Sequence, residues 1–118
     1  MTLFVDIDGV VVTNSGEYSK ISWGHTRGIK KNVDYLNSLY DNRETQIILV
    51  TARPEWYREI TEEQLKREGV KYHMLIMGLL HAKRVIINDY SLTNPYRSCG
   101  AINVKRNGFI EDQLVGEL

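Results

Sequence analysis

The chain has 118 residues, of which 42% are hydrophobic and 25% charged, and its 15 Lys or Arg balance its 15 Asp or Glu. This length predicts a single domain over 1–118, and zero net charge argues against nucleic acid as a non-specific ligand and against a polybasic membrane contact. The lone Cys99 excludes an internal disulfide and a multi-cysteine zinc site. No apolar run reaches the ~18 residues that cross a bilayer, and no basic leader precedes the first apolar run, so we expect a cytoplasmic protein.

Short apolar runs alternate with helical patterns along the chain. Ile29, Val33, Leu36 and Tyr40 recur at spacings typical of one helix face. The expected elements are a strand over 2–7, a helix over 28–41, a strand over 46–50, a helix over 54–68, strands over 72–77, 84–88 and 101–104, and a short helix in the last ten residues. This alternation predicts an α/β fold of the three-layer Rossmann-like type, with a parallel sheet of about five strands and helices on both faces.

Polar residues stand where three of the expected strands end. Ligands of open parallel sheets bind outside the carboxyl ends of the strands, so these residues are expected to share one rim. The groups that follow or precede the runs are Asp6 and Asp8 with Gly9, Thr51 with Arg53, Asn88 with Asp89, and Lys83 just before the fourth run.

Two carboxylates that leave one strand end together need a cation nearby to stay ionised. Mg²⁺ binds through one or two carboxylates, and Asp89 would add a ligand across the rim. With such a cation, Asp6 could attack a phosphoryl group and Asp8 could act as acid and base. Thr51 and Lys83 would then hold the phosphoryl oxygens, and Arg84 is the alternative cation to Lys83.

This pattern resembles the haloacid dehalogenase (HAD) superfamily of aspartate-dependent phosphohydrolases. The resemblance rests on residues 4–10, residues 48–53, Lys83, and residues 86–89, in that order. It implies an aspartyl-phosphate mechanism and assigns Asp6, Asp8, Thr51 and Lys83 to catalysis. It further implies a Mg²⁺ site made by Asp6, Asp8, the backbone carbonyl of Ile7, Asp89 and Asn88.

The intervals between the motifs leave no space for a cap domain. Between Asp8 and Thr51 the expected helix takes much of the chain, and the interval up to Lys83 is filled by a helix and a strand. The chain therefore resembles small capless phosphatases of sugar phosphates and capsule biosynthesis. We expect a Mg²⁺-dependent phosphomonoesterase acting on a phosphorylated sugar, nucleotide or other metabolite, and a homo-oligomer could cover the open site.

Neighbouring residues complete the expected substrate site. Arg53 could bind a phosphate or carboxylate in bidentate fashion, His25 lies in a segment that could cover substrate, and Gly9 and Ala52 flank the catalytic groups. Residues 61–68, by contrast, are expected to form a solvated helix face.

Two other functions compete with this one. A phospho-signalling receiver domain also gathers acids, Thr, Lys and Mg²⁺ on one rim, but its phosphorylated Asp ends a middle strand, and no Asp ends a strand between Asp8 and Thr51. A catalytically lapsed module that binds a phosphorylated ligand or protein partner is the second alternative, because Asn88 stands where the family often carries an acid.

Overall fold

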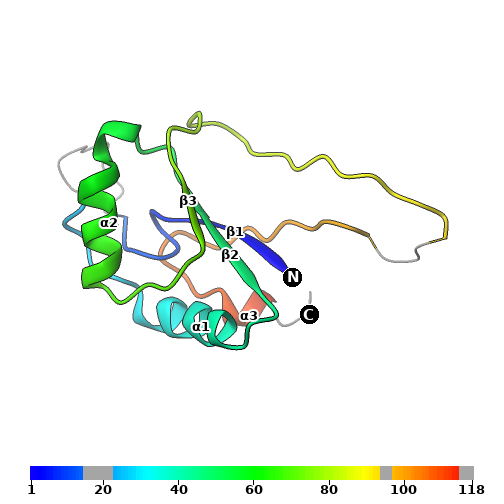
Figure 1. Cartoon of the computed structure of the whole chain (residues 1–118), viewed down its shortest axis with the longest axis horizontal. Helices are drawn as coiled ribbons and strands as arrows, with labels where there is room; N and C mark the ends of the chain where they lie inside the picture. The colour runs from blue at the N-terminus through cyan, green and yellow to red at the C-terminus, as the bar shows by residue number, and fades with distance from the viewer. Residues whose placement is uncertain (15–22, 94–96, 115–118) are drawn as a thin grey trace.

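The structure, a computed structural model, describes residues 1–14, 23–93 and 97–114. Strands and helices alternate through the first two thirds of the chain (Figure 1). In chain order the elements are β1 (Thr2–Asp6), α1 (Lys30–Asp41), β2 (Gln46–Val50), the short 3-10 helix η2 (Glu55–Tyr57), α2 (Arg58–Arg67), β3 (Met74–Ile76) and α3 (Glu111–Leu114).

The three strands form one parallel sheet in the order β1-β2-β3. Asp6 lies opposite Val50, and Val50 lies opposite Ile76, so the carboxyl ends of all three strands meet at one edge. Helix α1 connects β1 to β2 and α2 connects β2 to β3, as expected for parallel neighbours. The predicted α/β class is confirmed, but the expectation of about five strands is wrong for the described residues, which form three.

The core forms between this sheet and the two longer helices. Strand β2 is buried from Ile47 to Val50, which explains why its sequence is apolar without alternation. Val33 and Leu36 of α1 enter the same cluster as Leu65 of α2. Each such side chain contributes about 1.5–3 kcal/mol when it is fully buried. The sheet is therefore held rigidly, and its carboxyl edge is a fixed platform.

Helix α2 ends as the sequence predicts. The Gly69 N–H donates to the Lys66 carbonyl (3.1 Å), and the Val70 N–H donates to the Leu65 carbonyl (2.9 Å). This pairing is the Schellman motif, and it needs a left-handed residue, which Gly69 supplies with φ +71°. The predicted helix over 54–68 is confirmed as η2 followed by α2, with Pro54 just before the first turn.

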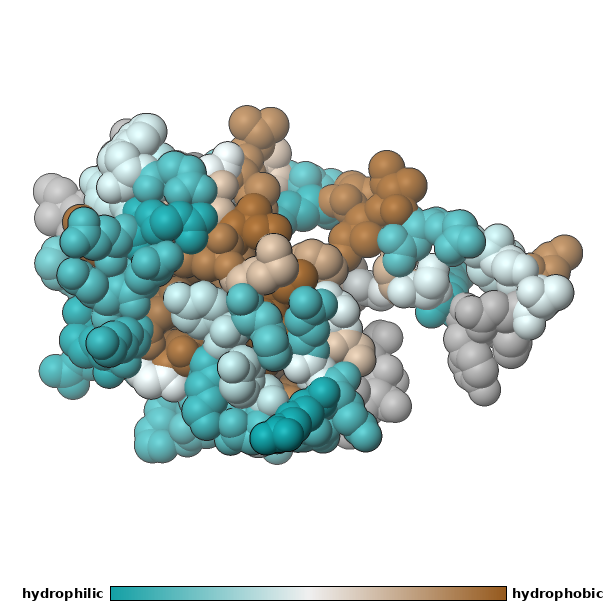
Figure 2. All heavy atoms as spheres, viewed as in Figure 1, coloured by the Kyte–Doolittle hydropathy of each residue, from teal (hydrophilic) through white to brown (hydrophobic). Residues whose placement is uncertain are grey.

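Residues 79–106, here called the extension, leave the body after β3 and return toward α3 (Figure 1). The predicted strands over 84–88 and 101–104 do not form. Every described residue from 80 to 101 is exposed, and Ile87 is 91% exposed. Hydrophobic side chains stand on this segment (Figure 2), namely Leu80, Val85, Ile86, Ile87 and Leu92. These runs have strand-like composition but lack a strand partner.

Asn32, fully buried on α1, joins the segment that follows the extension to the body. Its Nδ2 donates to the carbonyls of Val10 (2.8 Å) and Gly108 (2.7 Å), and its Oδ1 accepts the N–H of Ile110 (2.9 Å). One side chain thus joins α1, the loop after β1 and the segment before α3. Within the described ranges, no helix is both long and apolar enough to span a bilayer.

Candidate functional site

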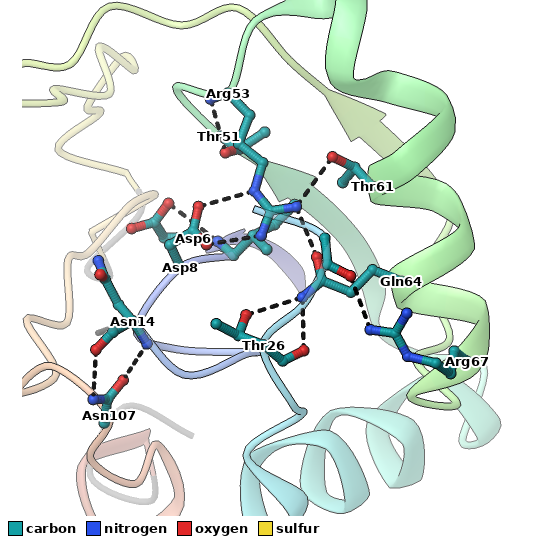
Figure 3. Close-up of polar contacts among 12 residues, drawn as sticks. Asp6, Asp8, Asn14, Thr26, Thr51, Arg53, Thr61, Gln64, Arg67 and Asn107 are labelled. Carbon is teal, nitrogen blue, oxygen red and sulfur yellow. Dashed lines mark hydrogen bonds and ion pairs between the residues drawn. The ribbon is translucent and has the colours of Figure 1, made fainter. Parts of the chain in front are cut away.

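The carboxyl edge of the sheet brings together several of the predicted site residues. Asp6 ends β1, Asp8 lies in the tight loop after it, and Thr51 and Arg53 follow β2 (Figure 3). The Thr51 N–H donates to the Ile76 carbonyl (3.0 Å), which continues the pairing of β2 with β3 by one residue. The predicted rim is therefore real for the residues of β1 and β2.

Arg53 is fully buried and faces Asp8 rather than solvent (Figure 3). Its Nε donates to one carboxylate oxygen of Asp8 (3.0 Å) and its Nη2 donates to the other (2.8 Å). Such a fork-to-fork pair is the strongest arrangement of these two groups. The guanidinium of Arg53, predicted to contact substrate, is engaged inside the protein here, and a contact between Arg53 and substrate stays a prediction.

The remaining donor nitrogen of Arg53 ties the pair to α2. Nη1 donates to Thr61 Oγ1 (3.1 Å) and to Gln64 Oε1 (2.7 Å), and Gln64 Nε2 donates in turn to the carbonyl of Thr26 (2.8 Å). Thr61 and Gln64 are fully buried, so residues 61–68 are not a uniformly solvated face. The spacing of Thr61, Gln64 and Leu65 at i, i+3 and i+4 is the signal that could have revealed this buried stripe.

Asp6 is the carboxylate that stays accessible. Its side chain is 43% exposed, and one oxygen pairs with Arg84 Nη1 at 3.2 Å. Burial of the carboxylate raises the pKa of Asp6 above its ordinary value; Arg84 opposes this, and the negative charge of Asp8 adds to it. Between the two cations considered for this edge, Arg84 reaches Asp6, whereas Lys83 lies exposed on the extension.

The residues expected to hold Mg²⁺ do not assemble into a ligand set. The Ile7 carbonyl already accepts N–H groups from residues 10–12, at 2.9–3.3 Å, and both oxygens of Asp8 are taken by Arg53. Asn88 and Asp89 stand exposed on the extension. Among the described residues, no three His, Cys, Asp or Glu gather as a metal site. The described residues therefore present no assembled ligand set for the ion, and Mg²⁺ binding stays a prediction.

The other expected substrate residues are scattered around the edge. Thr51 is buried, and its hydroxyl accepts the Arg53 N–H (3.1 Å). Ala52 is half-buried beside it, whereas His25 is exposed in the turn before α1. Gly9 is buried in the loop after β1, in a left-handed conformation (φ +90°) that only glycine adopts without strain.

Sequence reasoning missed Asn107, which meets this loop from the far end of the chain. Its N–H donates to the Gly9 carbonyl (2.7 Å). Its side chain exchanges two hydrogen bonds with the backbone of Asn14, at 2.8 and 3.0 Å (Figure 3). The Asn107-Gly108 pair, a common turn dipeptide, was the available signal.

No protein-family model and no curated protein matches this chain. A solved structure does: a chain of the Pnkp1/Rnl/Hen1 complex superposes with a TM-score of 0.55 and 22% sequence identity, over 71% of this chain. This chain spans 30% of the length of that one. The likeness is one of fold.

These findings overturn the family resemblance and what depended on it. The fold neighbour belongs to the Pnkp1/Rnl/Hen1 complex, and neither a family model nor a curated relative supports the haloacid dehalogenase superfamily. The inferred phosphomonoesterase acting on small metabolites is therefore wrong, and so is its alternative, the lapsed module of the same family. Catalysis, a single domain, oligomer formation and cytoplasmic location stay predictions.

Proposed function

We propose that this chain binds RNA and takes part in RNA repair, with the extension as its RNA-binding surface. Five of the 15 basic residues lie between residues 79 and 106, whereas Asp89 is the segment's one acid. The extension therefore carries a formal charge of +4, and the rest of the chain carries −4. The zero net charge of the whole chain, which argued against nucleic acid, hides this separation of positive from negative charge. A segment with excess basic residues is typical of a nucleic-acid site.

The exposure of the extension supports the same function. Its described residues from 80 to 93 are exposed, so Lys83 is accessible to a phosphate, whereas Arg84 is paired with Asp6. Tyr90 is 68% exposed, and an aromatic face offers a surface on which a base can stack. Stacking combined with loose electrostatic contact is typical of proteins that bind single strands without reading their sequence.

RNA is favoured over other polyanions by the fold comparison. The matched structure belongs to the Pnkp1/Rnl/Hen1 complex, which points to RNA repair. The observation that carries the proposal is the charge segregation, because it follows from this chain alone.

Fluorescence anisotropy with a labelled single-stranded oligoribonucleotide tests the proposal. The test variant replaces Lys83, Arg97 and Lys105 with Gln and spares Arg84, which pairs with Asp6. Because each contact to a single strand contributes about −0.7 to the slope of log K against log salt, the slope should shrink by about 2. The affinity at low salt should fall at least about tenfold.

The matched control replaces three exposed basic residues of the body, Lys30, Arg43 and Lys66, with Gln. It changes net charge equally, so it separates a local surface from overall charge. The control should bind RNA nearly as the unmodified chain does. Equal losses in the two variants, or no loss in the first, would contradict the proposal.

A further inference from the structure

Arg106, which no sequence pattern singled out, lies across the loop that joins β1 to the rest of the site. A Cβ atom built on Gly9 would stand 3.2 Å from Arg106 Cγ and 3.8 Å from its Cα. The stem of the arginine therefore covers the face of Gly9, where any larger residue would push it away. Because Gly9 follows Asp8 directly, Arg106 borders the Asp6–Gly9 loop.

The backbone around Arg106 is held in place on both sides. The next residue, Asn107, is fixed to Gly9 and to Asn14 by the three hydrogen bonds described above. The Gly108 N–H closes a turn onto the Lys105 carbonyl at 2.7 Å. Fixing the stem of an arginine lowers the entropy that is lost when its guanidinium binds a ligand.

The charges of this loop are already balanced without Arg106. Arg53 neutralises Asp8, and Arg84 neutralises Asp6. Arg106 is exposed, and within the described residues its guanidinium has no recorded hydrogen bond or ion pair. In the part of the chain that the structure describes, Arg106 is thus an unpaired cation whose aliphatic stem is held against Gly9. Because Asp6 and Asp8 are both neutralised by other arginines, the net charge around this loop is positive.

We infer that Arg106 binds the terminal phosphate of an RNA strand that lies along the extension, an inference that rests on the proposed function. A planar guanidinium donates two parallel N–H groups to a phosphate, and a terminal monoester carries more charge than an internal diester. Arg106 is the last residue of the extension and lies against Gly9, so an RNA strand that follows the extension meets the loop of Gly9 at this residue. Arg106 is therefore a specificity residue for phosphorylated ends.

The test compares oligoribonucleotides of one sequence that carry a 5′-phosphate, a 3′-phosphate or hydroxyls at both ends. The unmodified chain should bind one phosphorylated form about tenfold more tightly than the hydroxyl form, as expected for a charge-assisted pair. Arg106→Ala should abolish this preference, whereas the affinity for the hydroxyl form should change by no more than about threefold. Arg106→Lys should retain part of the preference.

Lys105→Ala is the matched control, since this neighbour is also a basic residue of the extension. It should weaken binding of all three oligonucleotides by the same factor and leave their ratio unchanged. Lys66→Ala, on exposed α2 surface, should change nothing.

The outcomes separate the inference from the proposed function. If the chain binds RNA but does not prefer a phosphorylated end, or if Arg106→Ala keeps the preference, the inference is wrong and RNA binding stands. If the chain binds none of the oligonucleotides, the proposed function itself fails. Circular dichroism of each variant checks that it is folded. If Arg106→Ala is unfolded, Arg106→Gln repeats the test with an uncharged side chain closer in length to arginine.

Discussion

At the scale of single residues, the two aspartates after β1 differ in what surrounds them. Asp8 meets a buried arginine through both of its oxygens, whereas Asp6 meets the half-exposed Arg84 through one. Removing one member of a buried pair leaves an uncompensated charge, which makes the Arg53–Asp8 pair a structural element of the fold. The Asp6–Arg84 pair is partly exposed to solvent, so less stability depends on it.

Asp6 therefore gives a pH prediction. Burial chiefly raises the pKa of its carboxyl, so the folded state retains the proton to higher pH than the unfolded state, whose pKa is about 3.8. The contribution of Asp6 to stability consequently falls as pH rises from near 3.8 through the folded pKa. Asp6→Asn should be more stable than the unmodified chain at pH 7, by less than about 1 kcal/mol because solvent screens this partly exposed group.

Urea unfolding at pH 7 and at pH 3 measures this effect. The difference between the two proteins should vanish at the lower pH, where both states of the unmodified chain hold the proton. A variant that is less stable at pH 7 would show that the pair with Arg84 outweighs the burial of the charge.

At the scale of elements, α1 holds the segment before α3 through the buried Asn32. Asn32→Asp preserves shape but turns a double donor into an acceptor that faces the carbonyls of Val10 and Gly108. Two partly buried carbonyls lose their donors, at about 1–3 kcal/mol each. We expect the free energy of unfolding to fall by about 3 kcal/mol, with lost hydrogen-exchange protection at the Ile110 amide.

Asn37→Asp on the same helix is the control, because Asn37 makes its hydrogen bonds to Gly69 and Lys71 in a solvent-exposed setting. It should cost less than about 1 kcal/mol. A similar cost for both substitutions would mean that Asn32 does not join the segment to the body as described.

Elements defined by local patterns could be predicted, whereas elements that need a distant partner could not. The spacing of Val33 and Leu36 and the uninterrupted apolar run of β2 identify α1 and a central strand from neighbouring residues alone. The runs over 84–88 and 101–104 have equally strand-like composition. Strand formation, however, depends on pairing and packing across the sheet, which composition does not encode.

In the candidate site, too, some features could be predicted from local sequence and others depend on distant contacts. Its location was predictable, since the carboxyl ends of parallel strands share an edge wherever the strands lie. The internal partners of Arg53, Asp8 and Gln64, could not be predicted because they come from other elements, and only the packing of α2 on the edge reveals them. Arg106 depends on contact between residues nearly a hundred positions apart.

At the scale of the whole molecule, a packed body contrasts with an exposed extension (Figure 1). Strands and helices hold the body by hydrogen bonds that break only when a structural unit opens. The described part of the extension has no helix or strand, and several of its hydrophobic residues, Ile87 and Leu92 among them, remain in solvent. Backbone of this kind reaches a protease site without first unfolding.

This contrast predicts the order of tryptic cleavage. Trypsin should cut first after Lys83, Arg84 or Arg97 of the extension, and only later within α1 or α2, where backbone must open before it fits the protease. Mass spectrometry of a digestion time course identifies the first fragments. Adding the single-stranded oligoribonucleotide should slow these early cuts and leave the later ones unchanged, because bound RNA covers the extension alone. Early cleavage within α1 or α2 would instead show that the body opens as readily as the extension.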